Sequence, residues 1–214
     1  MGMFDRFRKR PELPSFDAAL PRERLIQSGR IIFIDDETPI LLDELKQAGF
    51  AVDHDKTGDN IQKYDQQLYD VAIIDYHGVG NRLGSGQGLE IIKHVRRVSP
   101  RTRLVAYTSR SLTATESEFF RLSHVVLPKD LGLGDSLAMI ETELRKAFGK
   151  EHLFEALLTK LNRVNHEDKD RIQSELIKAL RKKDENGFKQ ALTKIAGEAA
   201  VKGTEYILSK LFVS

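Results

Sequence analysis

The feature that most constrains the fold is an alternation of two kinds of segment between residues 30 and 148. Short apolar runs alternate with longer segments whose apolar residues recur at helical spacing. The runs that we expect to form strands are 30–35, 51–55, 69–75, 101–109 and 124–128. The segments that we expect to form helices are 39–50, 59–68, 88–98, 115–123 and 135–148.

This alternation predicts a parallel sheet, because parallel strands need a crossover connection and helices usually supply it. The expected strands are apolar over most of their length, which is typical of strands that are buried on both faces. The sequence therefore predicts a doubly wound α/β domain over 30–149, followed by a small all-α region.

The two ends of the chain differ from this central part. Residues 1–29 contain scattered charges and three prolines with little periodicity, so we expect an N-terminal extension that lies on the domain or is loose. Residues 150–214 contain apolar stripes at helical spacing, with a helix stop expected at Asn186 and Gly187. Such short helices must pack on each other, on the α/β domain or on a second subunit, which indicates a helical output or dimerisation module.

Composition narrows the classes of function. With Cys 0 the chain has no thiolate metal site, and the charge of +2 indicates no nucleic-acid partner. No apolar run is long enough for a signal peptide or a membrane span, so we expect a cytoplasmic protein. The basic run at 181–183 is interpreted as a helix C-terminus rather than a phosphate-binding patch.

Polar side chains follow four of the expected strands at the point where each strand ends. They are Asp35, Asp36, Asp75, Thr108, Ser109 and Lys129. Ligands of such sheets gather outside the carboxyl ends of the strands, so we expect these side chains to share one site. Three neighbouring carboxylates repel each other and favour a hard cation such as Mg²⁺, while a lysine and a hydroxyl suit a phosphoryl group.

These residues resemble the five signature positions of the receiver domain of two-component response regulators. The resemblance covers Arg30 to Phe148 and implies the flavodoxin-like (βα)5 fold with the strand order 2-1-3-4-5. It also implies a Mg²⁺ site. Asp36 and Asp75 would be direct ligands with the backbone carbonyl of His77, and Asp35 would act through water.

The resemblance further implies that Asp75 accepts a phosphoryl group from a histidine kinase or a phosphotransfer protein. Lys129 would pair with the phosphoryl oxygens, and Thr108 would turn inward to bind them. The chain would then be a response regulator without enzyme activity beyond self-dephosphorylation, which signals through protein contacts or self-association of its tail. A DNA- or RNA-binding regulator with a divergent helical tail is an alternative, and a phosphatase that uses Asp75 as nucleophile is another.

The chain departs from the receiver pattern at three places. Receivers have a proline after the lysine, whereas Pro128 precedes Lys129 here. Val126 stands where receivers commonly have an aromatic residue, and the loop at 77–88 is several residues longer than usual. We interpret this glycine-rich loop as a flexible active-site loop rather than a nucleotide site, because the nucleotide-binding fingerprints are missing. For Asp35 and Asp36, helix capping is the alternative to metal binding.

Overall fold

The computed structural model describes residues 20–65, 68–109, 117–161 and 164–213. The chain divides into two compact units, one comprising Ala19–His152 and the other including Leu153–Ser214. The first unit contains all the strands of the described residues, and the second contains helices only. None of the helices within these described ranges is long and apolar enough to span a bilayer.

The first unit is built on a parallel sheet of five strands in the order β2-β1-β3-β4-β5. The strands are β1 (Arg30–Ile34), β2 (Ala51–Asp55), β3 (Val71–Asp75), β4 (Arg103–Thr108) and β5 (Val125–Pro128). Every residue of β3 is buried, as are most residues of β1 and β4, which is expected for a sheet that is covered on both faces. The predicted doubly wound α/β fold is therefore confirmed.

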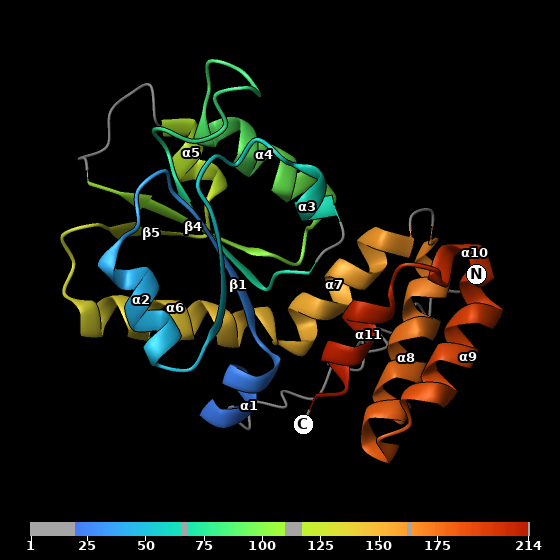
Figure 1. Cartoon of the computed structure of the whole chain (residues 1–214). Helices are drawn as coiled ribbons and strands as arrows, with labels where there is room; N and C mark the ends of the chain where they lie inside the picture. The colour runs from blue at the N-terminus through green and yellow to red at the C-terminus, as the bar shows by residue number, and fades with distance from the viewer. Residues whose placement is uncertain (1–19, 66–67, 110–116, 162–163, 214) are drawn as a thin grey trace, which may run out of the picture. The chain divides into compact units, whose positions relative to one another are not determined.

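Helices cover both faces of this sheet. Figure 1 shows α3, α4 and α5 on one face, and α2 and α6 on the other. Their bounds are α2 (Ile40–Gln47), α3 (Gln62–Asp65), α4 (Gly88–Val98), α5 (Ser117–Leu122) and α6 (Leu133–Ala147). Because side chains alternate along a strand, Ile32, Ala72 and Leu104 pack toward α4, whereas Ile31 and Phe33 point to the opposite face. Two apolar layers thus hold the sheet and fix where its strands end.

Helix α1 (Arg22–Ser28) was not expected, because the sequence predicts only an extension over 1–29. It belongs to the α/β unit, where Leu25 is fully buried and Arg22 Nε donates to Glu141 Oε2 of α6 at 3.0 Å. Seven residues with a single buried apolar side chain give no recognisable helical periodicity, which is why the pattern missed it. Residues 1–19 lie outside the described residues.

A buried ion pair closes the amino end of the sheet. Arg101 Nη1 donates to Asp70 Oδ1 at 2.6 Å, and both side chains are 0% exposed. Asp70 Oδ2 also accepts the backbone N–H of Arg30 at 2.9 Å, so the same carboxylate ties the start of β1 to the segment before β4. A buried charge is tolerated when its partners satisfy it in this way.

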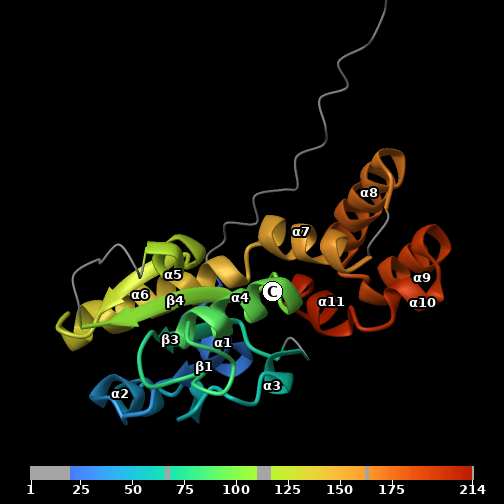
Figure 2. The ribbon, with the colours of Figure 1, turned by 90° about the horizontal axis from the view of Figure 1, so that it is seen from above.

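The second unit is a cluster of helices with a core of its own. It contains most of α7 (Lys150–Leu161), and α8 (His166–Lys182), α9 (Glu185–Ala196), α10 (Glu198–Val201) and α11 (Glu205–Leu211). Figure 1 shows α8 beside α9, and α9, α10 and α11 again lie together in Figure 2. Leu157, Leu176, Leu192 and Ile207 are fully buried in one core, so the amphipathic stripes of the tail pack on each other.

The helix stop expected at Asn186 and Gly187 is wrong, because both residues lie in the first turn of α9. Helix α8 ends at Lys182, and Lys183 adopts the left-handed conformation with φ 54°. Asp184 then caps α9, since its Oδ1 accepts the N–H of Gly187 at 2.8 Å. The Asn-Gly pair is common at helix ends, but the aspartate before it determined the local structure.

His124 completes the ladder between β4 and β5. Its backbone N–H donates to the carbonyl of Leu104 at 2.8 Å, and its Nδ1 accepts the N–H of Leu104 at 2.8 Å. The imidazole is therefore neutral and carries its proton on Nε2. Burial, followed by the charges of Arg103 and Arg96, lowers the pKa of His124 to about 4.

We expect acid to destabilise the α/β unit through His124. The unfolded chain takes up this proton near the ordinary histidine pKa of 6.5, whereas the folded chain does so near 4, so the stabilisation is present above pH 6.5 and is lost as the pH falls toward 4. Between about pH 7 and about pH 4.5, the free energy of unfolding should fall by roughly 1–2 kcal/mol more in the wild type than in His124→Gln, allowing for solvent screening of the half-buried ring.

Urea unfolding at several pH values measures this difference. The two chains are first compared at pH 7, so that the loss of the hydrogen bond from the Leu104 N–H is separated from the pH-dependent difference. A His124→Gln chain with an unchanged pH dependence would contradict the assignment.

Candidate functional site

The site lies at the carboxyl ends of the strands, because parallel strands all end at the same edge of their sheet. Asp35 follows β1 directly, Asp75 and Thr108 are the last residues of β3 and β4, and Lys129 follows β5. The register pairs Ile34 with Ile74, which sets the next residues Asp35 and Asp75 side by side. Residues from four strands thus meet through sheet geometry alone.

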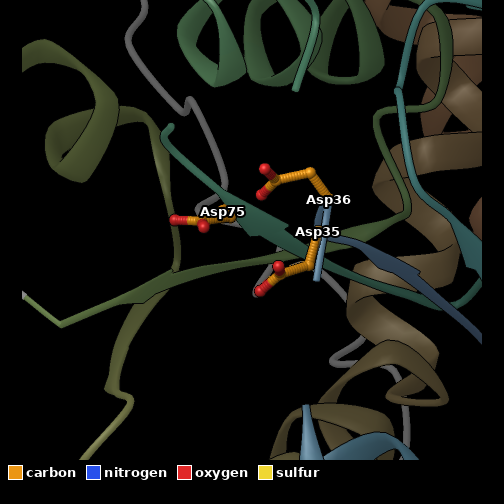
Figure 3. Close-up of side chains that lie close together, drawn as sticks. All are labelled: Asp35, Asp36 and Asp75. Carbon is orange, nitrogen blue, oxygen red and sulfur yellow. The ribbon is translucent and has the colours of Figure 1, made fainter. Parts of the chain in front are cut away.

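Three carboxylates converge there. Asp35, Asp36 and Asp75 each offer an oxygen, and these oxygens lie within 4.8 Å of one another. Figure 3 shows the three side chains gathered where their strands end. Asp35 is 0% exposed and Asp75 is 7% exposed, whereas Asp36 is open to solvent. Two desolvated carboxylates at this separation repel each other unless a cation lies between them.

Lys129 supplies that cation. Its Nζ donates to Asp35 Oδ2 at 2.9 Å and to Asp75 Oδ2 at 2.8 Å. The opposite oxygens of the same carboxylates accept backbone N–H groups, with Glu37 bound to Asp35 Oδ1 at 2.9 Å and Tyr76 bound to Asp75 Oδ1 at 2.7 Å. Each buried carboxylate is therefore held on both sides, which fixes its orientation.

These contacts oppose the effect of burial on the pKa values. Desolvation raises the pKa of Asp75, and Lys129 offsets this rise only in part, because the nearby charge of Asp35 raises it further. Burial alone would lower the pKa of Lys129, but its hydrogen bonds to Asp75 and Asp35 outweigh burial, so the pKa is raised. The lysine is thus a stable cation beside a carboxylate that is harder to ionise than usual.

Glycines let two backbone segments approach these carboxylates. Gly78 has φ 77°, and a Cβ atom there would lie 2.3 Å from Asp36 Cγ. A Cβ atom on Gly88 would lie 2.1 Å from the carbonyl oxygen of Asp75, and the N–H of Gly88 donates to Tyr76 O at 3.0 Å. The loop between β3 and α4 therefore forms a wall of the site that a larger residue would displace.

The same loop is tied to the loop after β2. Gly80 N–H donates to the carbonyl of Thr57 at 2.6 Å, and Arg82 N–H donates to Asp59 Oδ1 at 3.1 Å. Val79, next to Gly80, is fully buried. Hydrogen bonds and burial therefore hold the first half of this loop, and the flexibility expected for 77–88 stays a prediction.

The structure also decides the capping alternative for the two aspartates. Helix α2 begins at Ile40 after Pro39, and this N-cap residue offers no side-chain hydrogen bond to the first turn. Asp35 Oδ1 instead accepts the N–H of Glu37, within the loop that precedes the helix. Asp35 and Asp36 therefore belong to the carboxylate cluster and not to a helix cap.

Thr108 and His77 lie at the same edge of the sheet as the carboxylates, at the end of β4 and just after β3. Thr108 is 6% exposed at the end of β4, and its carbonyl accepts the N–H of Lys129 at 2.7 Å. His77 is half-buried, and its ring meets that of Tyr76 edge to face at 4.8 Å between centroids. The roles expected for the Thr108 hydroxyl and the His77 carbonyl stay predictions.

Two residues near the carboxylates were missed in the sequence. A glycine is needed at position 78, because a Cβ atom there would collide with the Asp36 side chain. Its place three residues after Asp75 could have indicated a turn that returns to the site. Tyr107 lies beneath Lys129, with the Nζ atom 5.0 Å from its ring centroid. Strand alternation could have placed Tyr107 on the same face as Asp75, since the two residues are register partners.

The donor set suits a magnesium ion. Carboxylate oxygens are hard ligands, and Mg²⁺ in proteins is usually held by one or two carboxylates together with waters and phosphate oxygens. Asp36 is exposed and Asp75 has an edge toward solvent, so an ion can reach both of them. The residues that are present therefore fit the cation that the sequence predicts.

No protein-family model and no curated protein sequence matches the chain. Solved structures do match it. A CheY-like response regulator receiver domain protein from Methanospirillum hungatei JF-1 is 20% identical with a TM-score of 0.47, and the match covers 56% of this chain and 95% of that chain. The response regulator protein TrrA from Thermotoga maritima, in complex with Mg²⁺-BeF, is 19% identical with a TM-score of 0.46, over 54% of this chain and 98% of that one.

A third match extends beyond the α/β unit. NtrX from Brucella abortus, in complex with ATP, is 14% identical with a TM-score of 0.50, and the match covers 72% of this chain but 35% of that chain. At these identities the likeness concerns the fold alone. The strand order β2-β1-β3-β4-β5 is the flavodoxin-like order that the sequence predicts, so the α/β unit has this doubly wound fold.

Proposed function

We propose that the chain is a response regulator of a two-component phosphorelay, which accepts a phosphoryl group on Asp75 from a histidine kinase or a phosphotransfer protein. The observation that carries this proposal is the position of Lys129 Nζ, within 2.9 Å of Asp35 and 2.8 Å of Asp75, beside a third carboxylate at the open edge of the sheet. A purely structural ion pair would need neither the third carboxylate nor access to solvent.

The residues divide the transfer between them. A carboxylate oxygen of Asp75 would attack the phosphorus atom, the bond from phosphorus to the donor's imidazole nitrogen would break, and the imidazole would leave with the electron pair. Lys129 would then pair with the new phosphoryl oxygens, and the Thr108 hydroxyl would donate to one of them. Asp75 is suited to this part, because its hydrogen bond from the N–H of Tyr76 holds it at the end of β3.

A magnesium ion would be held by Asp36 and Asp75 with the carbonyl of His77, and by Asp35 through water. When bound, the ion would supply positive charge to the oxygens of the transferred group. We propose no enzymatic turnover of an external substrate for the chain. The loss of its own phosphoryl group to water would be its only hydrolytic reaction.

We propose that the helical unit carries the output through protein contacts, with a protein target or a second copy of the chain. Its apolar residues form a core of their own, so its exposed surface is not needed to stabilise the helices. The histidine-kinase partner implies that the protein acts in the cytoplasm.

The direct test is phosphorylation by acetyl phosphate in the presence of Mg²⁺, followed by intact mass measurement. We expect the wild type to gain the mass of one phosphoryl group and Asp75→Asn to gain none, because the amide is a poor nucleophile and leaves no acyl phosphate. Asp53→Asn on β2 is the matched control and should be phosphorylated like the wild type. Equal phosphorylation of Asp75→Asn would contradict the assignment of the acceptor.

Magnesium should raise the melting temperature, because the folded chain binds the ion and the unfolded chain does not. At concentrations well above its dissociation constant we expect a rise of about 2–8 °C in thermal unfolding. Asp36→Ala should abolish most of this rise by removing a ligand. Asp43→Ala, an aspartate on α2 away from the carboxylate cluster, should keep it. A rise that survives Asp36→Ala would place the ion elsewhere.

A further inference from the structure

The ring of Tyr107 lies beneath the ammonium group of Lys129, and nothing in the proposed phosphoryl transfer uses it. We propose that Tyr107 is a positioning residue, whose ring face holds the Lys129 ammonium where it serves Asp35 and Asp75 together. The inference rests on the proposed function for its catalytic consequence, but the position of the lysine can be tested without any phosphoryl chemistry.

Sheet geometry places the ring beside the carboxylates. Tyr107 of β4 is the register partner of Asp75 on β3, and of Leu127 on β5, two residues before Lys129. Because side chains two residues apart point to the same face of a sheet, these side chains share the face of Asp75. The ring, the acceptor carboxylate and the lysine thus come from three adjacent strands.

The distance between ring and ammonium is that of a cation–π interaction. Lys129 Nζ lies 5.0 Å from the ring centroid, within the range of about 6 Å in which the ring quadrupole attracts a cation. The same Nζ donates to Asp35 and to Asp75. The ring attracts the ammonium without accepting a hydrogen bond, so it leaves the N–H donors to the oxygens.

The ring itself is held in place. Tyr107 is 5% exposed, and its ring meets that of Phe33 edge to face, with 5.1 Å between centroids and 89° between planes. Phe33 is fully buried on β1, two residues before Asp35. An immobile ring is a useful support for a lysine, whose long flexible side chain otherwise loses entropy when it is fixed.

The neighbouring strand offers no substitute. β5 consists of Val125, Val126, Leu127 and Pro128, so it contributes no aromatic ring near the lysine. Apolar aliphatic side chains there pack against the stem of Lys129 at most, and they carry no quadrupole that attracts the ammonium. The aromatic contact to the lysine therefore comes from β4.

The test uses the full-length chain and two substitutions at Tyr107. Tyr107→Phe keeps the ring and removes only the hydroxyl, whereas Tyr107→Leu keeps an apolar side chain and removes the ring. Nitrogen-15 NMR of the lysine ammonium groups reports whether Lys129 is hydrogen-bonded, because only an ordered ammonium exchanges its protons slowly. Lys129→Met identifies the Lys129 signal by removing it.

We expect a slowly exchanging Lys129 signal in the wild type, with side-chain protons shifted upfield by the ring. Tyr107→Phe should keep both properties, and Tyr107→Leu should lose the protected ammonium signal. With acetyl phosphate, Tyr107→Phe should be phosphorylated at the wild-type rate, and Tyr107→Leu should be about 2- to 10-fold slower. The comparison of the two variants therefore assigns the effect to the aromatic ring, because Tyr107→Phe keeps the ring and Tyr107→Leu removes it.

Phe50→Leu is the matched control. Phe50 is 5% exposed and has a cation above its ring, with Arg22 Cζ 5.6 Å from the centroid, but it lies just before β2, at the end of the sheet opposite the carboxylates. Loss of this ring should leave both the Lys129 signal and the phosphorylation rate unchanged. A similar loss in Phe50→Leu would attribute the effect to general destabilisation and overturn the proposal.

Three further results would also overturn it. They are a protected ammonium that persists in Tyr107→Leu, a Tyr107→Phe chain that loses it, and a wild type whose Lys129 protons lack the upfield shift. If Tyr107→Leu does not fold, the upfield shift of the Lys129 protons in the wild type and in Tyr107→Phe still tests whether the ring lies against the lysine. A wild type that resists phosphorylation while its Lys129 signal behaves as expected would refute the proposed function and leave the positioning role in place.

Discussion

The contact between one ammonium group and two buried carboxylates is the interaction on which the rest of the site depends. Asp35 and Asp75 lie at the ends of adjacent strands, where desolvation and mutual repulsion would otherwise work against folding. Lys129 Nζ lies within 2.9 Å of one and 2.8 Å of the other, and so makes this arrangement possible. The backbone donors to the two carboxylates and the ring of Tyr107 maintain the geometry of that one contact.

The two ends of the sheet place charge in opposite ways. At the amino end, Asp70 and Arg101 are both 0% exposed, and the Asp70 carboxylate accepts hydrogen bonds from Arg101 and from the backbone N–H of Arg30. At the carboxyl end, Lys129 is 23% exposed, and Asp36 is open to solvent. The first arrangement holds the chain together, and the second is accessible to a small anion or cation. Burial therefore separates a structural ion pair from an accessible one within the same domain.

Sequence reasoning reached the α/β fold and the candidate residues because both follow from simple periodicities. Apolar runs such as Val71–Ile74 predict buried strands, and the polar residue after each run must lie at the sheet edge. Helix α1 could not be predicted, because Leu25 is the single buried side chain of its seven residues and gives no helical periodicity. The break between α8 and α9 was misplaced, because Asp184 caps α9 and thereby includes Asn186 and Gly187 in its first turn. Tyr107 was missed because its contact with Lys129, the residue after β5, joins two strands and leaves no pattern within either one.

The place of Pro128 has a consequence for the outer side of the sheet. β5 is the last strand in the order β2-β1-β3-β4-β5, so one side of its backbone faces no further strand among the described residues. The N–H of Lys129 donates to Thr108 of β4, and N–H groups of successive residues in a strand point in opposite directions, so an N–H at position 128 would point outward. A proline has none to offer there. The imino acid therefore costs the sheet no hydrogen bond, and it removes a donor to which a strand of another chain could otherwise pair.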